Sequence, residues 1–175
     1  KLDEIQTAFE SVYTNLYNLI KEQDGSSVMG YFMVWAPGTV CLAQCDTAAM
    51  ISLDMFNDFV MPYLRRQCEF QDFSIYHVDG PMAVKTVDPL LEIESLDAIE
   101  YTPGPNVPGG GDPHWFDMYK KIKNAGKCVQ VVEVLPHEIA PLLDSIGPDG
   151  TYIQVNCYDI REMEIVIKAV EPYRS

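Results

Sequence analysis

The sequence predicts an α/β fold built on a parallel sheet, and three observations lead to it. Apolar segments with strand character alternate with amphipathic segments along the 175 residues. Five such strand-plus-helix units follow an initial helix, and no hairpin signal separates them. A complete (β/α)8 barrel needs about 250 residues. We therefore expect residues 1–175 to be a single partial domain, the carboxyl-terminal part of a TIM barrel whose other units lie upstream of Lys1.

The first third of the chain holds the initial helix and the first unit. Apolar residues spaced alternately by three and four predict a helix that ends near Gly25: Leu2, Ile5, Phe9, Val12, Leu16 and Leu19. Residues 28–44 read as one extended segment with a break at Pro37-Gly38. Ser52 is placed to cap the next helix, which Pro62 interrupts.

Four further units complete the chain. Strands are expected at 73–77, 97–101, 127–134 and 151–156. Aspartates are expected to cap the helices that follow three of them: Asp88, Asp112 and Asp159. The remaining helix is expected at 137–146, and the segment 103–111, with three prolines and four glycines, must be irregular.

Composition narrows the class of protein. With 47% hydrophobic and 22% charged residues, the chain has the make-up of a soluble globular domain. It has no apolar run of the roughly 20 residues that a membrane-spanning helix needs, and its amino terminus does not resemble a signal peptide, so we expect a cytoplasmic protein. Five cysteines without a CxxC pair suit reduced thiols. A formal charge of −14 argues against nucleic acid or an anionic membrane as a partner.

The most informative motif is His77-Val78-Asp79-Gly80-Pro81, at the end of an apolar strand. Residues i and i+2 of a strand point to the same side, so His77 and Asp79 should lie together at its carboxyl end. Parallel α/β enzymes keep their catalytic groups at that edge. The same edge should carry the polar residues that end the other strands: Asp46, Glu100, Glu133, Asn156 and Cys157.

This set of residues allows several kinds of site. His77 and Asp79, with Cys157 or Glu133 from a later strand, offer the mixed nitrogen, oxygen and sulfur ligands that suit zinc. Glu100 and Glu133 could instead be the paired carboxylates of a glycosidase. Gly109-Gly110-Gly111 before a helix could hold a phosphate, but Asp112 would repel one, which favours a mobile lid.

Several stretches together resemble the carboxyl-terminal half of the uroporphyrinogen decarboxylase superfamily, which includes cobalamin-dependent methyltransferases. They are Gln44-Cys45-Asp46, residues 55–66, His77-Val78-Asp79-Gly80-Pro81, residues 96–100 and Ala125-Gly126-Lys127. The resemblance covers roughly residues 28–170 and implies a (β/α)8 barrel. The decarboxylases carry a Gly-His-Gly type motif after the last strand, where this chain has residues 154–159. Porphyrinogen decarboxylation is therefore disfavoured.

The methyltransferases of that superfamily bind zinc through a His-x-Cys motif and a later cysteine. His77 matches the first position and Cys157 the last, while Asp79 stands where the thiolate is expected. Exchanging a thiolate for a carboxylate replaces a soft sulfur ligand with a harder oxygen ligand. Zinc could still bind, but activation of a thiol substrate is less assured. The chain looks closest to a branch with His-x-Asp-Gly-Pro in place of the zinc motif.

The resemblance implies a methyltransferase-type enzyme that acts with a corrinoid on a partner protein, or on a small methylated substrate. In this hypothesis His77, Asp79 and Cys157 form the central site, Asp46 and Glu100 orient the substrate, and 103–111 covers it. The alternative is a non-catalytic binding or assembly module, which the Asp79 exchange supports. Five barrel strands alone would leave open sheet edges and an apolar interior, so we expect these residues by themselves to form a dimer or higher oligomer.

Overall fold

The computed structural model describes residues 1–24, 28–29 and 34–174. Five strands form one sheet in the order β3-β4-β5-β6-β7, and all neighbouring pairs are parallel. Their bounds are β3 Val40–Gln44, β4 Phe73–Asp79, β5 Ala98–Thr102, β6 Cys128–Val134 and β7 Thr151–Val155. Because each strand pairs with the next one along the chain, every connection crosses over through a helix. The predicted α/β fold with a parallel sheet is confirmed.

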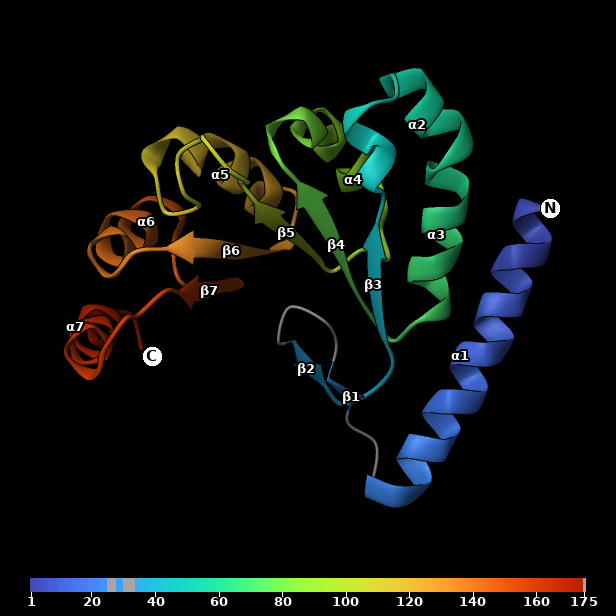
Figure 1. Cartoon of the computed structure of the whole chain (residues 1–175), viewed down its shortest axis with the longest axis horizontal. Coiled ribbons are helices and arrows are strands. Elements are labelled where there is room, and N and C mark those ends of the chain that lie inside the picture. Colours follow the sequence, from blue (N-terminus) through green and yellow to red (C-terminus); the bar gives the residue numbers. More distant parts are fainter. Residues whose placement is uncertain (25–27, 30–33, 175) are drawn as a thin grey trace.

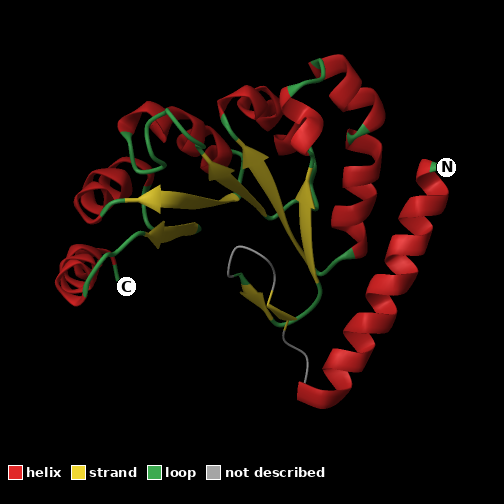
Figure 2. Ribbon diagram, viewed as in Figure 1, coloured by secondary structure: helices red, strands yellow, loops and turns green. Residues whose placement is uncertain are grey.

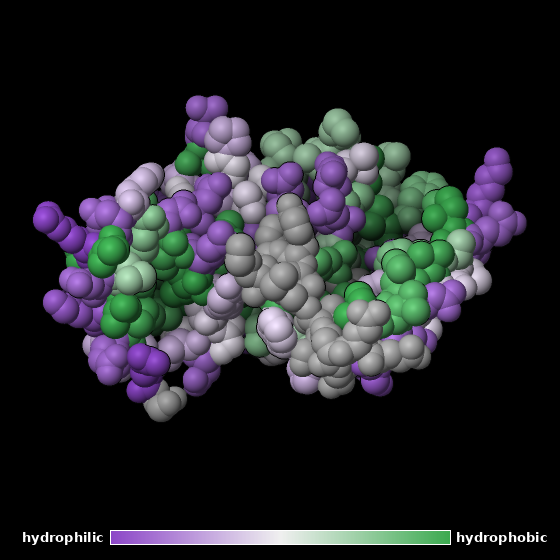
Figure 3. Space-filling view, turned by 60° about the horizontal axis from the view of Figure 1, so that its bottom comes forward, coloured by the Kyte–Doolittle hydropathy of each residue, from purple (hydrophilic) through white to green (hydrophobic). Residues whose placement is uncertain are grey.

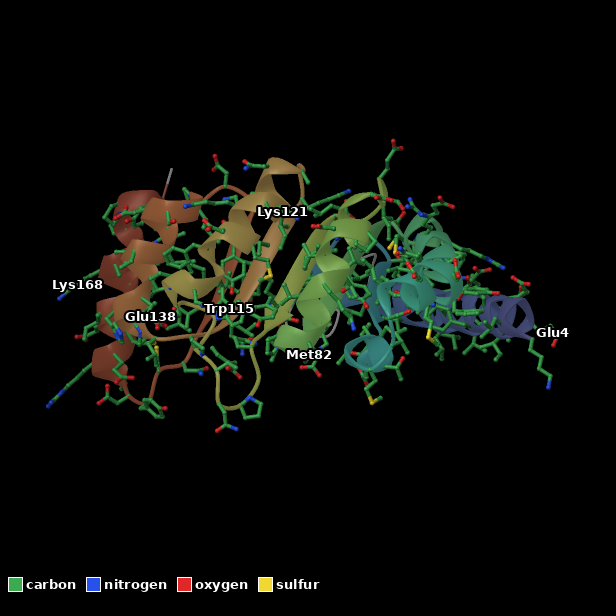
Figure 4. The ribbon with its side chains drawn as sticks, turned by 90° about the horizontal axis from the view of Figure 1, so that it is seen from above. Glu4, Met82, Trp115, Lys121, Glu138 and Lys168 are labelled. Carbon is green, nitrogen blue, oxygen red and sulfur yellow. The ribbon has the colours of Figure 1, made fainter. Side chains whose placement is uncertain are left out.

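The helices cover one face of this sheet (Figures 1 and 2). They are α2 Leu53–Phe59, α3 Met61–Phe70, α4 Val87–Leu91, α5 Phe116–Asn124, α6 Ile139–Ile146 and α7 Ile160–Val170. Seen from above, they follow one another along the molecule in chain order, from the α1 end near Glu4 to the α7 end near Lys168 (Figure 4). In the described part of the chain, no helix combines the length and apolar character needed to cross a membrane.

The core lies between the sheet and these helices. Alternate strand residues such as Val78, Ile99 and Val131 are fully buried against helical residues such as Leu90 and Ile122. Burying each such side chain contributes about 1.5 to 3 kcal/mol relative to leaving it exposed. The intervening strand residues must therefore point to the opposite face, because successive side chains of a strand alternate.

The first helix, α1 (Leu2–Asp24), lies outside α3 and contacts it through polar groups. The Arg66 guanidinium donates to both carboxylate oxygens of Glu10 at 2.7 Å, and Gln67 donates to Gln6 at 2.9 Å. The helix was expected, although its predicted stop at Gly25 lies outside the described residues. Its apolar residues are between 44% and 66% exposed: Leu2, Ile5, Phe9, Val12, Leu16 and Leu19.

The segment before β3 differs from the expectation of a single interrupted strand. Residues 28–29 (β1) pair antiparallel with Trp35–Ala36 (β2), so this region is a separate two-stranded sheet, and residues 30–33 lie outside the description. It lies near the amino ends of β3 and β4 (Figure 1). Antiparallel pairing of neighbouring segments corrects the prediction of a chain without hairpin-type pairing.

Local capping explains where several helices begin. The Ser52, Asp112 and Asp159 side chains accept hydrogen bonds from the backbone N–H of Met55, His114 and Glu162. These three predicted caps are confirmed. The predicted cap at Asp88 is wrong, because a 3-10 helix over Pro81–Thr86 leads directly into α4 and places Asp88 inside its first turn.

Apolar side chains remain exposed at both ends of the molecule. Besides α1, they include Ile160, Met163 and Ile167 of α7, which are between 47% and 70% exposed. In the space-filling view, green surface gathers on the left over α7 and on the right over α1 (Figure 3). β3 and β7 are the edges of the described sheet.

Candidate active site

A row of side chains crosses the sheet on the face turned away from the helices. Strand register aligns Gln44, His77, Glu100, Gln130 and Tyr152, one from each strand from β3 to β7. Side chains of register partners in a parallel sheet point to the same side. Because Gln44 ends β3 and His77 lies two residues before the end of β4, this part of the row lies near the carboxyl edge of the sheet.

His77 and Glu100 form a direct pair within this row. One Glu100 carboxylate oxygen, Oε2, contacts the His77 ring nitrogen Nδ1. The other oxygen, Oε1, accepts a hydrogen bond of 2.7 Å from the Thr102 hydroxyl, two residues further along β5. The Glu100 side chain is 0% exposed and that of His77 is 13% exposed. The carboxylate is therefore held on both oxygens and kept from water.

The charges around His77 favour its protonated form. Burial of the ring lowers the pKa of His77, but the hydrogen bond with Glu100 and the charges of Glu100, Asp79 and Asp46 outweigh it, and the pKa is raised above 6.5. An imidazole that stays protonated near neutral pH is a ready proton donor. Nδ1 is the ring nitrogen directed at Glu100, and Nε2 is the other nitrogen of the ring.

Asp79 and Asp46 lie above this pair at the carboxyl edge. Asp79 is exposed, ends β4 and is the register partner of Thr102 on β5. Asp46 is exposed and begins the 3-10 helix Asp46–Ala49 that follows β3. The expected convergence of His77, Asp79, Asp46 and Glu100 is therefore found. Its internal arrangement differs, because the carboxylate that orients the imidazole is Glu100 and not Asp79.

The three expected zinc ligands do not form a ligand group. Cys157 is an exposed free thiol in the loop after β7, whereas His77 and Asp79 belong to β4, with β5 and β6 between. Among the residues that the structure describes, no three His, Cys, Asp or Glu side chains lie close enough together to hold a metal. Zinc binding by His77, Asp79 and Cys157 therefore stays a prediction from the sequence.

Two glycines of 103–111, Gly109 and Gly110, pack closely onto β6. A Cβ on Gly110 would lie 2.1 Å from the Val132 carbonyl oxygen, and one on Gly109 would lie 2.9 Å from that of Glu133. The Trp115 indole N–H donates to Pro108 O at 3.0 Å, and the Tyr119 hydroxyl donates to Gly110 O at 2.9 Å. The space beside Gly109 and Gly110 therefore holds protein, and the two hydrogen bonds anchor Pro108 and Gly110 to Trp115 and Tyr119. The mobile lid stays a prediction.

Glu133 adopts an unusual backbone conformation at the same place. Its φ is +57°, in the left-handed region, and the pairing of β6 with β7 shifts register between Val131 and Val134. Left-handed φ in a non-glycine residue costs free energy and often marks a functional segment. The side chain is exposed, while Glu100 is buried and bonded on both oxygens. The two do not form the pair of accessible carboxylates that a glycosidase needs.

Sequence reasoning missed Thr102 and the row partners Gln44, Gln130 and Tyr152. Thr102 lies two residues after Glu100, so the same-side rule that linked His77 with Asp79 would have linked these two as well. The row partners could not be found in this way, because their alignment depends on the register between strands distant in sequence.

An apolar cleft of about 360 Å³ lies on the same face at the amino ends of the strands. Its lining includes Ile75 and Ala98, two residues before His77 and Glu100, together with Trp35 of β2. It extends up to Gln130 and Tyr152 of the polar row. Polar groups therefore concentrate at the carboxyl edge, and apolar ones below it.

Comparison with known proteins gave no relative: no family model, no curated protein and no solved structure matches the chain.

Proposed function

We propose that this chain is part of a (β/α)8-barrel enzyme in which His77, held by Glu100, exchanges a proton with a small-molecule substrate. The observation that carries the proposal is the fully buried Glu100 carboxylate bonded to an imidazole near the carboxyl edge of a parallel sheet. A buried charge pair is costly to build, and perturbed histidines with a carboxylate partner are characteristic of acid–base catalysis.

Three features support the barrel. The five strands are parallel and in sequential order, as in a barrel wall. The face away from the helices bears an apolar cleft lined by Val40, Ile75 and Ala98, and such side chains fill barrel interiors. β3 and β7 are the edges of the described sheet, and these edges and the exposed apolar residues of α1 and α7 would meet further β/α units of the same protein, although the Tyr13 hydroxyl already bonds with the Val40 backbone on β3.

The reaction class that we propose is methyl transfer from a small methylated substrate, to a corrinoid carried by a partner protein. The resemblance of the His77-Val78-Asp79-Gly80-Pro81 region to the methyltransferases supports this class. In such a reaction the group that loses its methyl gains negative charge or a lone pair. A protonated His77 would donate a proton to that atom, and Glu100 would stabilise the imidazolium. Asp79 and Asp46 would orient the substrate from the exposed edge.

The acidic character of the edge limits the substrate. The negative charges of Asp46 and Asp79 both act on His77. Lys85, in the segment after β4, donates a hydrogen bond from its ammonium group to the Ile51 carbonyl oxygen at 2.6 Å. A polyanion would meet repulsion here. This agrees with the missing Gly-His-Gly motif in disfavouring porphyrinogen decarboxylation.

The test is methyl transfer to free cob(I)alamin by the intact protein, followed by visible absorbance over a panel of methylated amines, ethers and thiols. His77→Asn should lower turnover by about 100-fold or more, since general acid catalysis contributes that much. His137→Asn, at an exposed histidine in the 3-10 helix Pro136–Glu138 after β6, is the matched control and should retain full activity. Full activity of His77→Asn would refute the proposal. Saturable substrate binding without turnover by the wild type would instead identify a binding module.

A further inference from the structure

A second cavity, of about 240 Å³, lies among α1, α3 and the carboxyl end of β3. Leu2 and Ile5 of α1, Leu64 of α3, and Tyr76 of β4 form part of its wall. None of the residues that line it carries a charge. Tyr76 belongs to the helix-covered face of the sheet, whereas His77 belongs to the other face. Gln44, at the end of the polar row, also lines this cavity, but His77 and Glu100 do not.

The Tyr76 side chain reaches this cavity and is 1% exposed. Its register partner on the edge strand β3 is Ala43, whose small side chain leaves room for the phenol beside it. The hydroxyl donates to no acceptor in the part of the chain that the structure describes, although a backbone hydrogen bond from Cys45 acts on its oxygen and opposes the rise in its pKa. Burial raises the pKa of Tyr76, so the hydroxyl keeps its proton and is a donor. A buried donor without an acceptor is unfavourable, and a ligand that supplies one relieves that cost.

Two other polar side chains on the wall are already bonded. The Gln67 amide donates to Gln6 Oε1 at 2.9 Å, and the Gln6 amide donates to Glu10 at 3.1 Å. This chain of bonds ties α1 to α3 and fixes that side of the cavity. Gln44, Cys45 and Tyr63 also line the cavity, and among the wall residues the Tyr76 hydroxyl is the buried group without an acceptor in the described part of the chain.

We propose that this cavity binds a small uncharged molecule with an apolar body and a carbonyl oxygen that accepts a hydrogen bond from Tyr76. A charged ligand is disfavoured because no lining residue would compensate its charge, and burying an unpaired charge is costly. Apolar contacts come from Leu2, Ile5 and Leu64. At about 240 Å³ the cavity is smaller than the about 300 to 1,000 Å³ of sites for drug-sized ligands, so it suits a molecule with a single ring.

The test uses cyclohexanone as the probe and methylenecyclohexane, which has the same shape without the oxygen, as its control. Dissociation constants are measured on the intact protein by NMR titration of labelled tyrosine rings. Tyr76→Phe keeps the ring and removes the donor, so it should weaken cyclohexanone binding about 3- to 10-fold, as expected for one hydrogen bond. Binding of methylenecyclohexane should not change.

Tyr101→Phe is the matched control. Tyr101 lies on the next strand, is 0% exposed and has a hydroxyl without a partner among the described residues, but it does not line the cavity. It should leave both dissociation constants unchanged. Ile5→Trp, at a residue 66% exposed, should reduce binding of both probes by filling the opening. Equal cyclohexanone binding by wild type and Tyr76→Phe, or no binding of cyclohexanone to the wild type at its solubility limit, would overturn the proposal.

Discussion

Glu100 contacts Nδ1 of His77 through one carboxylate oxygen and accepts a hydrogen bond from Thr102 through the other. His77 and Glu100 are 23 positions apart in the sequence, yet they are register partners on adjacent strands. The pair combines a carboxylate with no contact to solvent and an imidazole near the carboxyl edge of the sheet. The proposed activity, the pH dependence of stability and the effect of removing His77 all follow from this pair.

The pair should make stability depend on pH. The folded-state pKa of His77 is raised above 6.5, so its contribution to stability is fully present below the unfolded pKa and is lost as pH rises through the folded pKa. The free energy of unfolding should therefore fall above about pH 6.5, by at most about 1.4 kcal/mol per pH unit. Urea unfolding over this range measures it. Glu100→Gln should abolish the slope and lower the His77 pKa in an NMR titration; an unchanged His77 pKa in this variant would contradict the assignment.

Removing His77 should destabilise the fold more than a typical substitution. His77→Ala leaves the buried Glu100 carboxylate without its cationic partner, which costs about 3 to 5 kcal/mol. His137→Ala, at an exposed residue, should change the free energy of unfolding by less than about 0.5 kcal/mol. In the double variant His77→Ala, Glu100→Gln, part of the loss should be recovered because the uncompensated charge is gone. Strictly additive effects in this cycle would show that the two residues are not coupled.

Glu133 should be replaceable by glycine with a gain in stability. Its φ of +57° is strained for a side chain with a Cβ, and glycine adopts this region without cost. We expect Glu133→Gly to raise the free energy of unfolding by up to about 1 kcal/mol, measured by urea denaturation. Lys120→Gly, at an exposed position within α5, should lower it by about 1 kcal/mol. A loss of stability in Glu133→Gly would mean that the Glu133 side chain makes contacts that outweigh its backbone strain.

These residues studied alone should self-associate. Exposed apolar side chains on α1 and α7 and two open sheet edges favour association. Sedimentation velocity should show a dimer or larger species, and the double variant Ile5→Lys, Leu16→Lys should shift it toward monomer. Ser11→Lys, Asn15→Lys, at exposed polar positions of the same helix, is the control for added charge. A monomer at every concentration tested would refute this prediction.

Much of the fold was predictable from local patterns. The strand-helix alternation, the caps at Ser52, Asp112 and Asp159, and the helix interruption near Pro62 depend on residues close together in the chain. The antiparallel pairing of β1 with β2 was missed because apolar, β-branched residues suit a continuous strand and a paired one equally. The first turn of α4 was misplaced because a 3-10 segment satisfied its amide groups before Asp88 was reached.

The sequence by itself determined that His77 and Asp79 share one side of a strand, because the two-residue repeat of a strand is a local property. The tertiary structure decided which carboxylate holds the imidazole. Register aligned His77 with Glu100 and placed Cys157 beyond two further strands, so a carboxylate from the neighbouring strand took the place next to Nδ1. Register is set by packing of the buried faces of whole strands, and no short motif contains that information.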